Sequence, residues 1–490
     1  EDADEIRDRA RDSLVHAAER ASALAAAAEA CRYLARAAEL CAEEAERGEL
    51  ERKAGNFALQ AGLSDWAEVL LIGSAERFAA LGDRRELLAV ADLAWLDTSN
   101  GQLDRARERL EAALVEIDRG VVDPTVARIE GTLGNVLALS DEPDLALAHL
   151  DRAVKMAEAL GLNEVLVNAV ISKAIAGLGQ APNESRMQLM GAMAFALEAD
   201  FTWAWLRALN NLTEALLSIN RFDDALRYLE DGLEVARRIG DRSWETMLTG
   251  NMVSALVMLG RWDEAVERGR EVAELGGAGA LGSSMSLFAA NVYCARGELD
   301  AARELIDAYA DPTLQDSQLK ATVSAAFAAL QLAAGEPDEA FVQADIAIEA
   351  ALLGPGTTML ARGVELALEA ARLRGDVSLV HPVLDRVASH PLNERSPWLR
   401  GVRARAAGLL GDESQLAVAE GLFRETGMRF HVAVTLLDRA EASVGEASDA
   451  ALDEATAIFA ELGATPWLER AEALAAAHRE PAGVPLDVQG

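Results

Sequence analysis

The sequence is poor in cysteine, lysine and aromatic residues, and each shortage argues against a class of protein. Three cysteines in 490 residues, none in a CxxC pair, argue against a disulfide framework and favour a reducing compartment. The six histidines and three cysteines form no metal-ligand spacing, so the sequence predicts no metal site. None of the four lysines follows a glycine, which excludes a Gly-Lys-Ser/Thr phosphate loop.

Long apolar runs are absent as well, and charge of one sign dominates. No run approaches the ~18 residues that span a bilayer, and no signal-peptide pattern opens the chain. Asp and Glu number 81 against 46 Lys and Arg, a formal net charge of -35. Such a surface repels nucleic acids and anionic membranes, so we expect no direct nucleic-acid binding and no membrane docking. We find no GxSxG nucleophile motif or distinctive carboxylate pair, and predict a protein that is not an enzyme and has no cofactor.

A short phrase recurs along the whole chain: a small residue, two variable positions, aspartate, one variable position and alanine. One clear copy begins at Gly101, with Asp104 and Ala106 in their places. We call the first residue of each copy the anchor, and anchors recur every 34–41 residues. Clear anchors are Gly62, Gly101, Asp141, Asn220, Gly260, Gly297 and Gly335, and degenerate ones lie near Ala25, Gly179, Gly375, Gly411 and Gly445. A period this steady predicts a helical-repeat solenoid.

Each position of the phrase has a physical role. The anchor glycine ends a helix, because a residue without a Cβ readily takes the left-handed conformation. The aspartate is predicted to be the N-cap of the next helix, and the alanine is small because two helices cross there. Further small residues recur seven before the anchor and twelve after it. They are Gly55, Ala94, Gly134, Ser172, Thr213, Ala290 and Ala328 in the first set, and Ala113, Ala153, Gly191, Gly232 and Ala347 in the second.

Apolar residues between the anchors follow helical spacing, as at Leu226, Leu229 and Leu233. Each unit is therefore predicted to be helix A, a tight turn and helix B, which buries its apolar stripes against neighbouring units. The predicted fold class is all-α, a superhelical solenoid of about 11–12 antiparallel helix pairs with a ~38–40 residue period. We predict one continuous domain over residues 1–480, its first unit at about 5–45 and its last at about 428–480, and a disordered tail at 481–490.

The small-residue positions and the helix–turn–helix unit resemble the tetratricopeptide repeat, whose usual period is ~34 residues. The resemblance implies a right-handed superhelix. Longer units of this kind are similar to the C-terminal regions of large bacterial signalling proteins, namely LuxR-type ATP-dependent regulators and multidomain adenylate/guanylate cyclases. The phrases that carry this likeness are Ala208–Ala215, Leu422–Met428 and Ile458–Trp467. The nucleotide-binding, cyclase and DNA-reading domains of those proteins have no counterpart in this sequence.

The resemblance also indicates which side chains face the concave groove, where ligands of such solenoids usually bind. Inward positions of helix A lie six, ten and thirteen residues before the anchor. Six before lie Trp95, Asn135, Lys173, Glu214, Asn291 and Glu369; ten before lies Asn210; thirteen before lie Arg128, Arg207 and Arg362. Such side chains could hydrogen-bond to and stack on an extended peptide or a sugar-like effector. A clamp for the acidic C-terminus of a heat-shock chaperone needs lysine at set inner positions. The residues found ten before the anchor are instead Ala91, Gly131, Ala169, Asn210, Gly250 and Leu287, which disfavours such a clamp.

Other candidate features are interpreted as structural. The aromatics of the turn phrase, Trp66, Phe222, Trp262 and Phe341, are taken as packing residues between units. The histidines are taken as surface or packing residues. The glycine-rich run at 276–284 follows a helix instead of a strand, so we interpret it as a flexible link and not as a phosphate cradle.

Two functions fit these features. The leading hypothesis is a cytoplasmic sensor and protein-interaction arm of a bacterial signalling or transcriptional regulator, which binds a protein or peptide partner, or a small effector, in its groove. It predicts further polypeptide upstream of Glu1. The alternative is a free-standing scaffold or adaptor that joins partners, or self-associates, through its end repeats, with a start codon close by.

Overall fold

The computed structural model describes residues 3–115, 122–140, 142–275, 284–309, 317–353, 358–389, 394, 396–442 and 445–479. Over these residues it is α-helical, with two short 3-10 helices and no strand. The elements of the first half are α1 (Ala3–Ala23), α2 (Ala27–Leu40), α3 (Glu44–Gln60), α4 (Ser64–Leu81), α5 (Glu86–Ser99), α6 (Leu103–Val115), α7 (Pro124–Leu139), α8 (Pro143–Leu160), α9 (Asn163–Gly177), α10 (Pro182–Glu198), α11 (Thr202–Ser218), α12 (Phe222–Ile239) and α13 (Arg242–Met258). Those of the second half are α14 (Trp262–Leu275), η1 (Met285–Leu287), α16 (Phe288–Arg296), α17 (Leu299–Asp307), α18 (Ser317–Ala333), α19 (Pro337–Leu353), α20 (Thr358–Leu373), η2 (Val377–Val380), α21 (His381–Ala388), α22 (Pro397–Leu409), α23 (Ser414–Glu425), α24 (Arg429–Ala442), α25 (Glu446–Leu462) and α26 (Thr465–Arg479).

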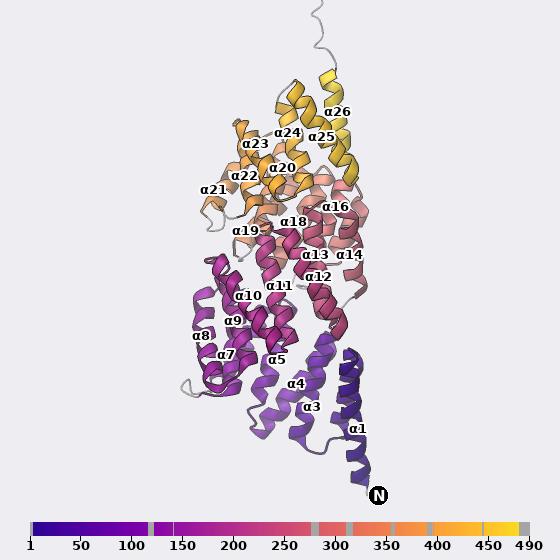
Figure 1. Ribbon diagram of the computed structural model, residues 1–490, viewed down its shortest axis with the longest axis vertical. Helices are drawn as coiled ribbons and strands as arrows, with labels where there is room; N and C mark the ends of the chain where they lie inside the picture. Colours follow the sequence, from indigo (N-terminus) through magenta and orange to yellow (C-terminus); the bar gives the residue numbers. More distant parts are fainter. Residues whose placement is uncertain are drawn as a thin grey trace, which may run out of the picture.

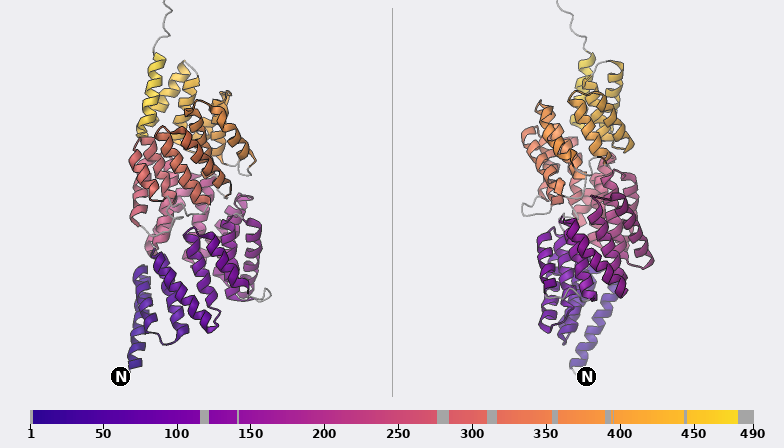
Figure 2. Two further views of the ribbon diagram at one scale, coloured as in Figure 1. Left: turned by 180° about the vertical axis from the view of Figure 1, so that it is seen from behind. Right: turned by 90° about the vertical axis from the view of Figure 1, so that its left-hand side faces the viewer.

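Consecutive helices pack in pairs, from α1 with α2 to α24 with α25, and α26 packs against α25. The pairs coil into a superhelix that is elongated along one axis, with α1 towards one end and α26 towards the other (Figures 1 and 2). The predicted all-α superhelical solenoid is therefore confirmed. None of the described helices combines the length and the apolar character that crossing a bilayer requires.

The turn inside each unit has the predicted left-handed anchor at most positions. Gly62 has a φ of 73° and Gly260 a φ of 76°, and Asn220 takes the same conformation with a φ of 60°. Gly179 is an exception among the described anchors, since its φ is not positive. The anchor at Asp141 and the glycine-rich run at 276–283 lie outside the described residues.

The predicted role of the phrase aspartate is wrong. Helix B begins one residue before the aspartate, so Asp65 and Asp223 lie inside the first turn of α4 and α12. The N-cap of α4 is Leu63, which has no side-chain capping hydrogen bond. The aspartates therefore act through their charge, which is favourable beside the unpaired N–H groups at the positive end of a helix.

The predicted small positions include true points of close approach. A Cβ added at Gly134 would lie 2.5 Å from Cγ of Leu150, and one at Gly55 would lie 2.7 Å from Cγ of Leu71. Helix A and helix B of these units thus meet where helix A has no side chain. Gly191 differs, because a Cβ there would meet no atom within 4 Å.

Successive turns of the superhelix touch one another. The Ser243 hydroxyl donates to the carbonyl of Leu59 at 2.9 Å, across 184 residues of sequence. Nε of Arg296 donates to the carbonyl of Leu462 at 3.2 Å. In a simple solenoid each unit contacts only its neighbours. Here units about four to five repeats apart also meet, so each turn of the superhelix packs against the next turn.

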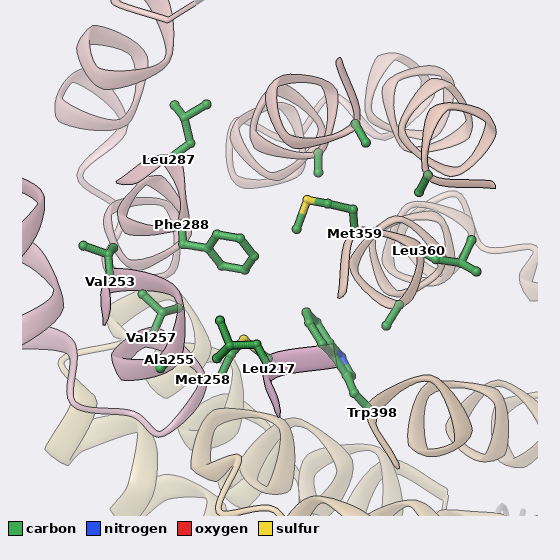
Figure 3. Close-up of a cluster of buried hydrophobic side chains, with 14 of the residues drawn as sticks. Leu217, Val253, Ala255, Val257, Met258, Leu287, Phe288, Met359, Leu360 and Trp398 are labelled. Atoms are coloured by element: carbon green, nitrogen blue, oxygen red, sulfur yellow. The ribbon is translucent and has the colours of Figure 1, made fainter. Parts of the chain in front are cut away.

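A buried apolar cluster lies where the first turn meets the second. In Figure 3, the side chains of Phe288, Met359 and Trp398 converge on one space between α16, α20 and α22. Trp398 has no exposed surface, and its backbone N–H donates to the side-chain oxygen of Asn220 at 2.8 Å. The left-handed anchor of one unit therefore holds the start of α22 in the next turn.

The close approach at Gly134 predicts the effect of adding one methyl group. Gly134→Ala should destabilise the fold by about 1–3 kcal/mol, because the new Cβ displaces Leu150 from a packed crossing. Gly191→Ala is the matched control: the site is exposed and mid-helix, so alanine should stabilise by up to about 1 kcal/mol. Thermal unfolding midpoints measure both variants, and equal shifts of the same sign would contradict the packing role of Gly134.

Candidate functional site

Two cavities open inside the superhelix, and the helix A of successive units forms most of their walls. The N-terminal cavity has a volume of about 450 Å³ and is lined by residues from α3 to α13. The C-terminal cavity has a volume of about 260 Å³ and is lined by residues from α13 to α26. Each cavity therefore belongs to one turn of the coil, which the contacts between the turns keep narrow.

Arg207 of α11 is the most deeply buried cation in the wall of the N-terminal cavity, with 4% of its surface exposed. Its guanidinium donates to the backbone carbonyl of Asn168 at 2.9 Å and to the Asn168 side-chain oxygen at 3.0 Å. It also donates to the side-chain oxygens of Asn135 and Ser172, both at 2.7 Å. Three consecutive units are thus joined by one side chain.

No carboxylate of the described residues lies within ion-pair distance of Arg207, so its charge has no direct counter-ion. Burial lowers the pKa of the Arg207 guanidinium to about 10, which still leaves it positively charged at neutral pH. A buried charge without an opposite partner is costly to folding. In this fold only neutral hydrogen-bond acceptors stabilise the buried Arg207 guanidinium.

Three tryptophans from different units line the same cavity in an edge-to-face chain. The ring centroids of Trp95 and Trp203 are 4.8 Å apart, and those of Trp203 and Trp244 are 5.7 Å apart. The Arg207 guanidinium lies 5.6 Å from the centroid of the Trp95 ring, within cation–π range. The cavity thus combines flat apolar surface with a fixed positive group.

A group of paired charges lies around Asp92 of α5, which is 4% exposed. Its carboxylate accepts from Arg52 at 2.9 Å and from Arg128 at 2.7 Å. The amide of Asn56 donates to it at 3.1 Å. Glu49 also pairs with Arg52, so two guanidinium groups face two carboxylates and this part of the wall is close to electrically neutral.

Asp241 is the buried N-cap of α13, and it lines the N-terminal cavity as well. Its carboxylate accepts from the backbone N–H of Trp244 at 3.1 Å. Burial raises the pKa of Asp241 to about 6, although backbone hydrogen bonds oppose the shift. The group is therefore partly protonated under mildly acidic conditions.

The C-terminal cavity contains a compensated charge network instead. Arg362 donates to the side-chain oxygen of Asn291 at 2.6 Å and to Glu365 at 2.8 Å. Nε2 of His431 lies 3.1 Å from Glu365. Burial alone would raise the pKa of Glu365, but His431 and Arg362 overcome this effect and lower it to about 2. Every charge of this group has an opposite partner.

Next to that group, Glu369 pairs with Arg405 and Arg372, and Arg405 also binds Asp438. Although burial acts in the opposite direction, the two arginines lower the pKa of Glu369. Aromatic rings cover another part of the wall, with 5.3 Å between the centroids of Trp262 and Phe430. The C-terminal cavity is thus apolar and electrically balanced.

The structure brings seven of the ten predicted groove residues to the two cavities. Trp95, Arg128, Asn135 and Arg207 line the N-terminal cavity, and Asn291, Arg362 and Glu369 line the C-terminal one. The remaining three have protein partners elsewhere. Lys173 pairs with Asp151 at 2.6 Å, and Asn210 and Glu214 both accept from the amide of Asn251, at 2.9 and 3.4 Å. Whether any of the ten binds a ligand stays a prediction.

Several lining residues were missed, and some carried a usable signal. Arg52 and Glu365 lie ten residues before the anchors Gly62 and Gly375, an inward position by the same rule. Trp262 is both a packing residue, with its indole N–H bound to the carbonyl of Val257 at 3.1 Å, and part of a cavity wall. His431, interpreted as a surface or packing residue, also lines the C-terminal cavity.

The described part of the chain contains neither a cluster of metal ligands nor an exposed cysteine. No group of three His, Cys, Asp or Glu side chains there is placed to hold a metal ion. Cys31, Cys41 and Cys294 are free and buried. Burial raises the pKa of the Cys31 and Cys294 thiols to about 12, so the reactive thiolate is scarce at neutral pH.

Comparison with known proteins supports the repeat class. Residues 205–239, which cover most of α11 and all of α12, match the tetratricopeptide repeat family. No curated protein matches the sequence. The chain thus contains a segment that matches the tetratricopeptide repeat, within an all-α solenoid of helix pairs with left-handed anchors.

Three solved structures that match the chain are distant from it in sequence. A Rap protein in complex with competence and sporulation factor is 14% identical, with a TM-score of 0.41, over 89% of this chain and 99% of that one. Yeast Tom70 is 12% identical, with a TM-score of 0.34, over 97% and 98%. A chain of the APC/C hetero-tetramer Cut9–Hcn1 is similarly distant, at 12% identity and a TM-score of 0.42, over 95% of this chain and 94% of that one.

The raised pKa of Asp241 predicts an unusual dependence of stability on pH. The folded chain binds this proton more tightly than the unfolded chain, so the stability contributed is present below about pH 4 and is lost as the pH rises through 6. Asp241→Asn keeps a capping acceptor and removes the charge. We expect it to raise the free energy of unfolding at pH 8 by on the order of 2 kcal/mol and to change it little at pH 4.

A second N-cap aspartate provides a control of opposite sign. Asp123 caps α7, and hydrogen bonds from Thr125 outweigh burial to lower the pKa of its carboxyl. Compared with the wild type, Asp123→Asn should therefore lower the free energy of unfolding at neutral pH, and it should lower it less at acid pH. Denaturation curves at pH 4, 6 and 8 test the pair, and parallel pH profiles for the two variants would contradict both assignments.

Proposed function

We propose that the chain is a protein-interaction module that binds an extended segment of a partner protein, or a small effector, inside its superhelix. The observation that carries the proposal is the interior wall. Successive helices A present arginine, asparagine and tryptophan side chains to open cavities of about 450 and 260 Å³. These are side chains of the kind that anchor ligands in buried binding sites.

An extended peptide suits this wall because its backbone offers a donor and an acceptor at each residue. Asparagine side chains supply both functions, and arginine supplies several donors in a plane. Asn56, Asn135 and Asn168 line the N-terminal cavity from three different helices. A chain lying along the coil axis would pass them in turn, and its apolar side chains would meet the tryptophans.

We further propose that the module is one continuous domain that serves as the sensor arm of a bacterial signalling regulator. This part rests on the sequence phrases shared with such proteins, and the free-standing scaffold is the alternative. The intact mass of the native protein, with peptide mapping, separates them. A mass far above 52 kDa with a nucleotide-binding or cyclase segment supports the regulator, and a mass equal to the chain's own 52.1 kDa excludes it.

Binding in the interior is tested by two charge-matched substitutions. Arg128→Ala removes a cavity-lining arginine but leaves Asp92 bound to Arg52 and Asn56. Lys173→Ala removes an equal charge outside the cavities, where the side chain pairs with Asp151. For a partner captured from the source organism and then purified, we expect Arg128→Ala to weaken binding about 10-fold or more.

Lys173→Ala should change the dissociation constant of the same partner by no more than about 2-fold from the wild-type value. Isothermal titration calorimetry with the isolated partner measures both variants. Equal loss in the two, or a loss with Lys173→Ala alone, would place the binding surface outside the cavity. Hydrogen exchange gives a second view, because a partner inside the coil should protect the helices A and not the outer helices B.

A further inference from the structure

We infer that the outer face of α10 binds an amphipathic helix of a partner protein, one that carries basic residues at both ends of its apolar face. The surface consists of Met187, Met190, Gly191, Ala194 and Leu197, which we call the α10 stripe. No residue of α10 lines either interior cavity, so this surface is separate from the interior site proposed above.

α10 is apolar on two opposite faces. Its inner face buries Ser185, Leu189, Ala192 and Ala196. Its outer face is exposed, with 66% of Met187 and 67% of Leu197 accessible. Single exposed apolar side chains are ordinary, but α10 also exposes Met190 and Phe195, and no other described helix has more than two large ones. A helix that is apolar all round is normally covered on both faces, so the outer face of α10 lacks a partner.

The neighbouring outer helices are charged where α10 is apolar. At the same spacing from its own buried face, α12 exposes Arg227, Glu230, Asp231 and Glu234. Similarly, α8 exposes Asp151 and Lys155. Residues 187–197 of α10 include no charged side chain, although the chain as a whole has a formal net charge of -35. The α10 stripe is therefore a local departure from an outer surface whose charge keeps the solenoid soluble.

The geometry of the stripe suits a helix. Met187, Met190, Gly191 and Ala194 have the spacing i, i+3, i+4 and i+7, which forms the hole that receives one side chain of a facing helix. A Cβ built on Gly191 would meet no atom within 4 Å, so this hole is open. Methionine side chains adapt their shape to what packs on them, and they are common in grooves that bind amphipathic helices.

The charges at the ends of the stripe select the partner. Glu184 and Glu198 are exposed on the same face of α10, one at each end of the stripe, and neither forms an ion pair with a described residue. Asp200 is exposed just beyond the helix, and the half-buried Arg186 is the only basic residue of α10. A second copy, in either direction along α10, would bring acidic ends against acidic ends. A helix with lysine or arginine at both ends of its apolar face has the complementary charge.

The test adds three fluorescein-labelled helical peptides to the full chain. The basic probe has leucines at three- and four-residue spacing and a pair of lysines at each end. The acidic probe has glutamates in place of the lysines, and the scrambled probe has the composition of the basic probe without the leucine spacing. Fluorescence anisotropy measures each dissociation constant. We expect the basic probe to bind at least 10-fold more tightly than either of the others, and equal binding of the basic probe and either control overturns the inference.

Substitutions then locate the site. Gly191→Gln fills the open hole and should weaken binding of the basic probe 10-fold or more. Gly421→Gln on the outer helix α23 is the matched control, because Gly421 is also exposed and a Cβ there meets no atom within 4 Å. It should change the dissociation constant by less than about 2-fold. Glutamine is a good helix former, so both variants should fold, and thermal unfolding checks this. Equal dissociation constants in the two variants overturn the inference.

Two further measurements test the charge and the occupant. Glu184→Gln combined with Glu198→Gln should lower the ratio of basic to acidic probe affinity several-fold, and an unchanged ratio overturns the basic chemistry assigned to the partner. Sedimentation equilibrium of the chain alone should show no dimer that depends on the stripe. A dimer that Gly191→Gln dissociates and Gly421→Gln does not would show that a second copy covers the stripe, which also overturns the inference.

Discussion

Contacts between successive turns hold this solenoid in a narrow coil, and the interior depends on them. The bonds from Ser243 to Leu59, from Trp398 to Asn220 and from Arg296 to Leu462 each join segments more than 160 residues apart. Without them the units would still stack on their neighbours, but the concave face would be free to open. Because the turns touch, that face lines two open cavities.

The two cavities differ in how they treat charge. In the C-terminal cavity Arg362, Glu365 and Glu369 have side chains of opposite charge as partners. In the N-terminal cavity Arg207 is held by neutral acceptors only. Buried charge of this kind weakens a fold unless something else compensates it. The named charges of the C-terminal cavity are thus paired, whereas Arg207 in the N-terminal cavity has no ion-pair partner among the described residues.

Local features of this fold were predictable from sequence, and distant contacts were not. Anchor spacing gave the helix pairs, since a left-handed glycine is a local requirement of the backbone. The predicted N-cap role of the phrase aspartate was wrong because helix B begins one residue before it, which places the aspartate inside the first turn. Thirteen before the anchor, Arg128, Arg207 and Arg362 all reached a cavity, whereas Lys173 and Glu214 were drawn to Asp151 and Asn251. Contacts between turns follow from small rotations summed over several units, which no single repeat encodes.

Asn220 illustrates how one residue of the repeat can both form a turn within its unit and contact the next turn of the superhelix. Within its unit it replaces glycine as the left-handed anchor, and asparagine is among the few residues that take this conformation at modest cost. Unlike glycine, it has a side chain, and that side chain accepts the N–H of Trp398 in the next turn. Positions that look equivalent when the repeats are aligned can therefore differ in the folded superhelix. At one such position a turn residue also holds two successive turns of the superhelix together.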